Sequence, residues 1–207
     1  MCKAISIFTG TNNFVSDTIT AARFNEYFGF TQKDVDQLLI DADVSEKTEQ
    51  VKVWYDGYHL MVHRQMGNEI CSIYNPKSVV EAMMRHKFGT YWNQTETYEA
   101  LKIYIQMDMD GLKDSVIRML AGERVPVNVE TFSNDMTTFA TKDDVLTLLG
   151  HLGYLAYDSV NETVRIPNKE VSQEYVNAIS TMNWYGVAES VEDSRKLLES
   201  LWALDEE

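Results

Sequence analysis

The chain has 207 residues, of which 44% are hydrophobic, and its 32 acidic and 18 basic residues give a formal net charge of -14. This apolar fraction is ample for a core and predicts a soluble globular protein with one large or two small domains, whereas the charge opposes nucleic-acid binding, which depends on basic groups that neutralise phosphates. No apolar run approaches the roughly 20 residues of a membrane helix and the N-terminus lacks a secretory signal, so we expect a cytoplasmic protein without membrane contact.

The first part of the chain is predicted to be mainly helical. Residues 4–14 begin with a strand-like alternation and run into a Gly/Asn turn, and a short amphipathic helix ending at Gly29 follows. Thr31 is expected to cap the next helix, with Asp34 three residues later forming an imperfect capping box. A third helix is predicted over residues 46–55.

The central feature of the sequence is the motif W-Y-D-G-Y and the residues that follow it. Asp56 and Gly57 predict the end of the preceding helix, because glycine takes the left-handed conformation without a Cβ penalty. Aromatic and β-branched residues then predict a hairpin with strands at 58–63 and 69–74, joined by a polar turn.

The next helix is predicted to begin at Asn75 and Pro76, since proline is favoured in the first turn. It is expected to bury both Met83 and Met84 in a core. An aromatic loop and two further helices, the second over residues 111–121, complete this part of the chain.

The C-terminal third has a different pattern. The run V-P-V-N-V predicts a short strand, and Thr141 is expected to cap a helix that ends at Gly153. A hairpin over residues 154–167 follows, so helix, strand, helix and hairpin come in the order of a winged helix. Helices over 169–182 and 189–204 are predicted to end the chain, which gives a mainly α fold with small β elements (α+β).

A winged helix raises the question of DNA binding, and the charge of this segment argues against it. Residues 141–179 carry three basic and six acidic side chains, a net charge of -3. A duplex-binding wing needs the opposite sign, so a wing that contacts protein or is purely structural is favoured.

Motifs for catalysis and metal binding are missing from the sequence. Neither G-x-x-x-x-G-K-[ST] nor G-x-G-x-x-G occurs, so the chain alone is not expected to be an enzyme that hydrolyses nucleotides. His59 and His63 stand four apart in a predicted strand without the glutamate of a zinc protease, and Asp110 in D-M-D-G is better explained as a helix cap than as a calcium ligand. Cys2 and Cys71 have no metal-ligand spacing and are expected to be reduced thiols.

Several separate stretches together resemble one family, the AAA-ATPase-like proteins of gut and other anaerobic bacteria, which are often fused to a C-terminal restriction-endonuclease-like nuclease domain. The stretches are S-I-F-T-G-T-N-N-F at 6–14, F-G-F-T-Q-K-D-V at 28–35, W-Y-D-G-Y at 54–58, Y-N-P-K-S-V at 74–79, Y-W-N-Q-T at 91–95, L-G-Y-L at 152–155 and I-P-N-K-E-V at 166–171. The likeness spans nearly the whole chain, with a minor departure at Thr11.

The resemblance implies that the chain is the middle of a longer protein in which ATP and Mg²⁺ bind to an upstream ATPase core. It assigns residues 1–14 to the tail of that core, 15–121 to a helical lid-like domain, 122–182 to a winged-helix-like region and 183–207 to a helix or linker towards a nuclease domain. The phosphate loop, the metal-holding acid and the nuclease residues of the family are missing from this sequence. The upstream core and the downstream nuclease domain are therefore the partners that the resemblance implies, and a further protein partner is possible.

Six residues are candidates for a nucleotide-facing site in the intact protein: Trp54, Asp56, Gly57, Tyr58, Asn75 and Pro76. The alternative interpretation is that these residues have a structural role only and stabilise the fold of the lid. Two functions stay open at this point: the regulatory lid and winged helix of an ATPase, or a self-standing helical interaction module derived from one.

Overall fold

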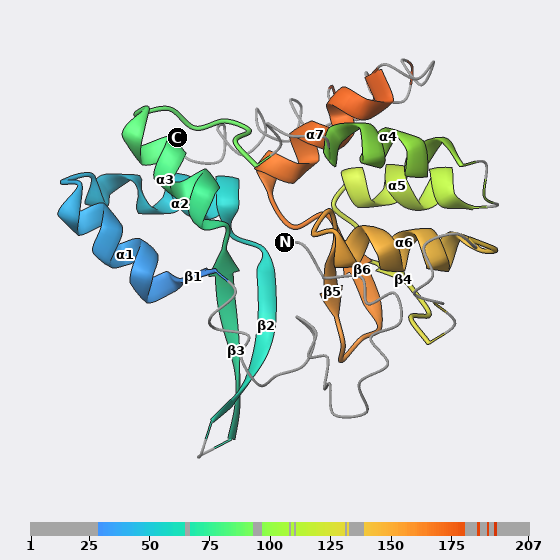
Figure 1. Ribbon diagram of the computed structural model, residues 1–207, viewed down its shortest axis with the longest axis horizontal. Coiled ribbons are helices and arrows are strands. Elements are labelled where there is room, and N and C mark those ends of the chain that lie inside the picture. Colours follow the sequence, from blue (N-terminus) through green and yellow to red (C-terminus); the bar gives the residue numbers. More distant parts are fainter. Residues whose placement is uncertain are drawn as a thin grey trace, which may run out of the picture.

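The computed structural model describes most of the chain from Gly29 to Ser180. The described residues are 29–64, 67–92, 97–107, 109, 111–130, 132, 139–180, 186, 190 and 193. Within them the chain has seven α-helices and six short strands in two antiparallel sheets, which confirms the predicted α+β class (Figure 1). The strand predicted at 4–14, the helix before Gly29 and all but two residues of the helix predicted at 189–204 lie outside these residues.

The first helices begin where the sequence predicts. α1 (Gln32–Asp41) has a complete capping box, in which the Asp34 amide donates to Thr31 Oγ1 at 3.3 Å and the Thr31 amide donates to the Asp34 carboxylate at 2.8 Å. The Thr31 hydroxyl, which donates to the Asp34 carboxylate at 2.7 Å, and the Thr31 amide lower the pKa of Asp34. The predicted third helix is a 3₁₀ turn, η2 (Ser45–Lys47), followed by α2 (Thr48–Tyr55).

The predicted hairpin forms the first sheet. Strands β2 (Tyr58–Arg64) and β3 (Gly67–Tyr74) pair antiparallel, and β1 (Phe30–Thr31) adds to the other side of β3, which gives the order β1-β3-β2. Both strands of the hairpin extend further into the turn than the residue pattern indicated. α3 (Pro76–Met84) then begins at Pro76, with the Asn75 side chain accepting from the amides of Lys77 and Ser78.

Two sequence predictions in this part are wrong in detail. Met84 is 74% exposed, and only Met83 belongs to the core, because α3 turns one face to solvent. Gly57 does not close α2 in a left-handed turn: the C-cap is Asp56 in an extended conformation, and Gly57 has a φ of +136°, far from the roughly +57° of left-handed helix.

The second sheet belongs to the C-terminal part of the chain. Its strands β4 (Val125–Pro126), β5 (Ala156–Asp158) and β6 (Thr163–Arg165) are antiparallel in the order β4-β6-β5. Four helices surround it: α4 (Thr97–Gln106), α5 (Leu112–Leu120), α6 (Lys142–His151) and α7 (Lys169–Ser180). The Thr141 cap of α6 is confirmed and forms a second capping box, with Asp144.

Most of the buried apolar side chains belong to one of two clusters. Nine buried residues between Val35 and Tyr91 form one, and sixteen between Leu101 and Ala178 form the other. α4 and α5 therefore pack with the second sheet, and not with α1–α3. We call residues 30–92 the N-terminal unit and residues 97–180, as far as they are described, the C-terminal unit; they lie on the left and the right of Figure 1.

None of the helices in the described part of the chain combines the length and the apolar character that a membrane span requires.

Candidate functional site at the junction of the two units

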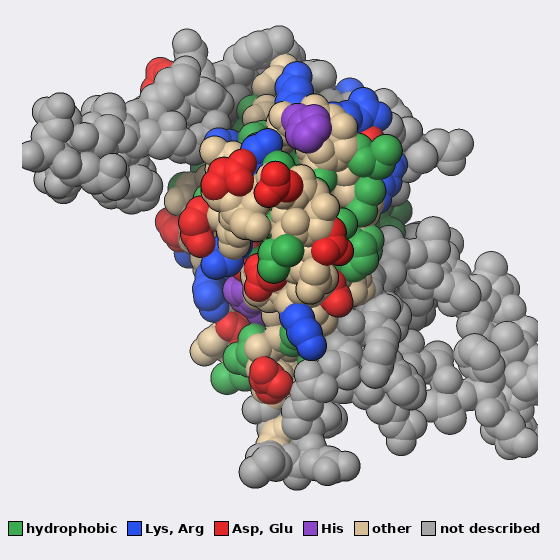
Figure 2. Space-filling view, turned by 90° about the vertical axis from the view of Figure 1, so that its left-hand side faces the viewer, with side chains coloured by type: hydrophobic (Ala, Val, Ile, Leu, Met, Phe, Trp, Pro, Cys, Tyr) green, Lys and Arg blue, Asp and Glu red, His purple; other side chains and the backbone are tan. Residues whose placement is uncertain are grey.

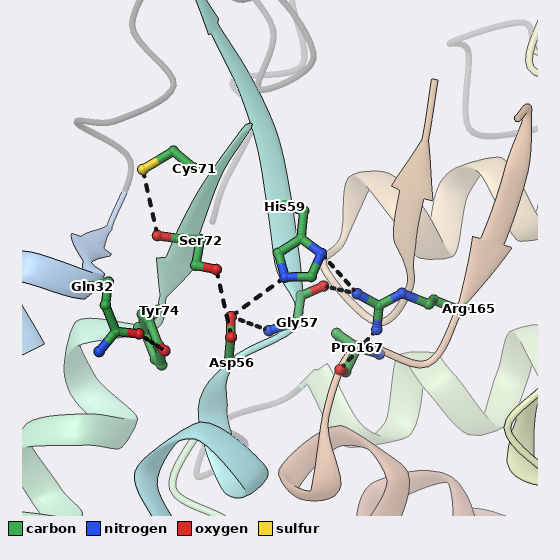
Figure 3. A network of polar contacts seen from close by, with 9 residues as sticks. All are labelled: Gln32, Asp56, Gly57, His59, Cys71, Ser72, Tyr74, Arg165 and Pro167. Atoms are coloured by element: carbon green, nitrogen blue, oxygen red, sulfur yellow. Dashed lines mark hydrogen bonds and ion pairs between the residues drawn. The ribbon is translucent and has the colours of Figure 1, made fainter. Parts of the chain in front are cut away.

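Two of the predicted site residues, Gly57 and Tyr58, meet the C-terminal unit where β2 begins. Asp56, Gly57 and Tyr58 lie at the end of α2 and the start of β2, close to the end of β6 (Figure 3). The motif W-Y-D-G-Y is thus part of a contact between segments about a hundred residues apart in sequence.

Gly57 is required at this contact by the close approach of another chain segment. A Cβ atom at this position would lie 1.9 Å from the carbonyl oxygen of Pro167, a distance that the backbone could relieve only by moving. The positive φ of Gly57 also favours glycine at this position.

Arg165 joins the same two segments with its guanidinium group. One terminal nitrogen donates to the carbonyl of Gly57 at 2.7 Å and the other to the carbonyl of Pro167 at 3.1 Å. Burial lowers the pKa of Arg165, but a guanidinium remains charged at neutral pH. Its charge is therefore held in the contact by backbone carbonyl groups.

His59 connects Arg165 to Asp56. The guanidinium lies 3.3 Å from His59 Nδ1, and His59 Nε2 lies 3.8 Å from the Asp56 carboxylate. Arginine can only donate, so Nδ1 accepts and neutral His59 carries its proton on Nε2, towards Asp56. Asp56 also accepts from the Gly57 amide at 2.6 Å and from Ser72 Oγ at 3.5 Å, which fixes the start of the hairpin (Figure 3).

Tyr58 reaches into the C-terminal unit. Its hydroxyl donates to the carbonyl of Gly153 at 2.6 Å, directly after α6, and burial of this hydroxyl raises the pKa of Tyr58. Gly153 in turn approaches Trp92, whose ring would lie 3.2 Å from a Cβ atom there.

Glu170 is a residue of the junction that sequence reasoning did not single out. It lies at the start of α7, is 2% exposed, and its carboxylate accepts from the amides of Tyr91 and Trp92 at 2.7 and 2.9 Å. These amides belong to the N-terminal unit. Desolvation raises the pKa of Glu170, although both amides act in the opposite direction.

These contacts form a continuous polar link between the units. We call it the polar seam; it consists of Gly57, Tyr58, Tyr91, Trp92, Gly153, Arg165, Pro167 and Glu170.

The other candidates lie beside the seam. Trp54 is partly buried, stacks on Phe88 at 6.5 Å between ring centroids, and has the ammonium group of Lys169 5.1 Å from its ring centre. Asn75 and Pro76 begin α3 and line a cleft that also contains Tyr58. The six candidates are thus near one another, but they face different neighbours.

The cleft between the hairpin and α6 has a volume of about 530 Å³. We call it the apolar cleft; its lining consists of Tyr58, His59, Leu60, Ile73, Tyr74, Asn75, Pro76, Trp92, Val129, Leu146, Thr147, Gly150, His151, Leu152, Gly153, Leu155, Ala156, Tyr157 and Val164. Side chains from both units contribute to it, so its shape depends on how the seam holds them together.

Among the described residues no group of three or more His, Cys, Asp or Glu side chains could hold a metal ion. Asp56, His59 and Arg165 contact one another and backbone groups, and no serine or cysteine nucleophile is hydrogen-bonded to His59 in this part of the chain.

Comparison with known proteins gave no family model, curated protein or solved structure that matches this chain.

Proposed function

We propose that this chain is the regulatory lid and winged-helix-like part of an AAA-ATPase-like protein, and that it does not catalyse ATP hydrolysis by itself. The order of the family-like motifs supports this proposal, and so does the strand order β4-β6-β5 after α5, which a winged helix would have. The chain offers no phosphate-cradling loop in its sequence.

The observation that carries the proposal is the position of W-Y-D-G-Y in the polar seam. Gly57 and Tyr58 are bonded to Arg165 and Gly153 at 2.7 and 2.6 Å, so a displacement of the hairpin must displace the C-terminal unit as well. Such a rigid link suits an element that transmits the state of a nucleotide site to a neighbouring domain.

Asp56 is the candidate best placed to sense a nucleotide in the longer protein. Its carboxylate is 25% exposed, whereas the Tyr58 hydroxyl and the Gly57 carbonyl already have partners in the C-terminal unit. The other candidates would then support the fold around Asp56.

A self-standing interaction module is the second candidate function. Large apolar side chains are exposed on each helix of the N-terminal unit: Ile40 on α1, Val53 on α2 and Met84 on α3 are 61%, 60% and 74% exposed. Exposed apolar residues of this size favour contact with another protein.

Charge favours a protein partner over DNA for this chain. The segment from α1 to α2 carries six acidic and three basic side chains, and Figure 2 shows groups of acidic side chains on the face formed by α1–α3. A polyanion is repelled by such a surface.

ATP turnover and nucleotide-induced thermal shift test the proposal. We expect neither for the chain alone, and both for a polypeptide extended upstream to include a phosphate-binding loop. Asp56→Ala should reduce turnover of the extended form, whereas Asp41→Ala, at the end of α1, should not. Turnover by the chain alone, or a natural reading frame without such a loop upstream, would contradict the proposal.

A further inference from the structure

The apolar cleft differs from the rest of the molecule in its charge. A quarter of the chain is Asp, Glu, Lys or Arg (24%), yet none of the nineteen residues that line the cleft is one of these. A charged ligand would lose its hydration there without gaining a counter-ion. The cleft is thus suited to an uncharged ligand, and its volume of about 530 Å³ lies within the usual range of small-molecule pockets.

Two polar groups lie one helical turn apart on the α6 wall of this cleft. Thr147 is 4% exposed, and its hydroxyl has no hydrogen-bond partner among the residues that the structure describes. His151 Nδ1 lies 2.8 Å from the carbonyl of Thr147, so Nδ1 carries the proton and neutral His151 presents Nε2 as an acceptor. The Thr147 hydroxyl oxygen is buried below the cleft surface, so His151 Nε2 is the hydrogen-bonding group that this wall offers to a ligand.

Aromatic side chains from both units supply the other walls. The backbone amide of Trp92 donates a hydrogen bond to Glu170, and its ring makes an edge contact with the Tyr154 ring at 4.8 Å between centroids. These contacts hold Trp92 in place. Tyr58 is fixed by its hydrogen bond to Gly153, and Tyr157 lies on β5. Rings that are already held in place bind another ring at a small entropic cost.

We propose that the apolar cleft is a binding site for a small, uncharged aromatic ligand whose hydroxyl or amide group donates a hydrogen bond to His151 Nε2. The proposal does not depend on the function proposed above, because it follows from the lining of the cleft alone. It identifies the chemical class of the ligand by shape, neutrality and one hydrogen-bonding group.

Three probes with one ring system separate these requirements: 2-naphthol, naphthalene and 2-naphthoate. In calorimetric titrations of the whole chain we expect 2-naphthol to bind about 5-fold more tightly than naphthalene, the effect of one ordinary hydrogen bond. We expect 2-naphthoate to bind more weakly than either, because the cleft has no basic side chain.

Gly150→Leu is the variant that fills the cleft. Gly150 lies in α6 and lines the cleft, and a Cβ atom there has no neighbour within 4 Å. The substitution should therefore preserve the fold, which thermal unfolding would verify, and weaken binding of 2-naphthol at least about 10-fold. Asn177→Leu, at an exposed position of α7, controls for added apolar surface and should leave binding unchanged.

His151→Phe tests the hydrogen bond, and it should abolish the advantage of 2-naphthol over naphthalene. The proposal is overturned if 2-naphthol does not bind the folded protein. That result is expected if the cleft instead receives an apolar side chain of a peptide. The proposal is also overturned if Gly150→Leu has no effect, if 2-naphthoate binds most tightly, or if 2-naphthol and naphthalene bind the unaltered protein equally.

Discussion

The polar seam and the apolar cleft lie between the same two units, but they are built in opposite ways. In the seam, Glu170 is a buried carboxylate and Arg165 a partly buried guanidinium, and backbone groups of the other unit accept from or donate to each of them. In the cleft there is no charged side chain, and the Thr147 hydroxyl has no partner in the described part of the chain.

Because of this difference, the two parts of the junction are suited to separate tasks. Buried charges with matched partners are sensitive to displacement, because removing one partner leaves the other desolvated. The seam therefore fixes the relative position of the units. Apolar walls without charged side chains tolerate the entry of another molecule, so the cleft can receive a ligand while the seam keeps its shape.

The largest expected effect is at Gly57. Gly57→Ala should destabilise the protein by about 4 kcal/mol in urea unfolding, since its Cβ would overlap the Pro167 carbonyl and its φ is positive. Gly67 is the matched control, because its φ is +135° and a Cβ there meets nothing within 4 Å. Gly67→Ala should cost only about 1 to 2 kcal/mol, and equal losses for both variants would show that the contact with Pro167 is unimportant.

Glu170 is expected to have the second largest effect. Glu170→Ala leaves the amides of Tyr91 and Trp92 buried without an acceptor and should cost about 3 kcal/mol. Glu170→Gln retains one acceptor oxygen and should cost about 1 kcal/mol. Urea unfolding gives the loss of stability in each variant. If Glu170 acts through its hydrogen bonds, Glu170→Ala loses much more than Glu170→Gln. If Glu170 only fills space, the two losses depend only on the side-chain volume removed.

Arg165 should contribute less, because its side chain is only partly buried. Arg165→Met keeps the aliphatic length, loses the bonds to Gly57 and Pro167, and should cost about 2 kcal/mol in chemical unfolding. Arg124→Met provides the comparison, since Arg124 pairs with Asp158 at 2.9 Å on the surface and should contribute below about 1 kcal/mol. A loss at Arg124 as large as that at Arg165 would contradict the distinction between seam and surface.

The smallest effect is the pH dependence that Glu170 imposes. Because desolvation raises its pKa in the folded protein, the folded state binds more protons than the unfolded state above the ordinary glutamate range, and stability falls as pH rises through that window. The Asp34 and Asp144 pKa values are lowered, so these groups act in the opposite direction at lower pH. The free energy of unfolding should be measured for the unaltered protein and for Glu170→Gln from about pH 4 to about pH 7. We expect the stability advantage of glutamate over glutamine to decrease as the pH rises. A stability advantage of glutamate that increases with pH would contradict this prediction.

Local signals explain why the secondary structure could be predicted so closely. The capping boxes at Thr31 and Thr141 and the start of α3 at Asn75 and Pro76 depend on residues within one turn of each other, and all are present in the structure. The hairpin likewise needs only adjacent strand-forming segments.

The junction could not be predicted in this way, because the hydrogen bonds between its two units join residues 78 to 108 positions apart. One signal for Glu170 was nevertheless present. Glu170 and Glu174 fall on the same helical stripe as Val171, Tyr175 and Ala178, which marks them as buried acids, whereas the charge count treated them as surface groups.

Hydrogen exchange tests most directly the claim that the seam joins two units into one body. The core cluster of the N-terminal unit has nine buried residues against sixteen in that of the C-terminal unit, so the N-terminal unit should depend on the larger unit for stability. We predict that amides in α1 and α6 of the unaltered protein exchange with the same free energy of opening, and that Gly57→Ala accelerates exchange in α1 much more than in α6. Opening free energies for α1 and α6 that differ by more than about 2 kcal/mol in the unaltered protein would contradict the account.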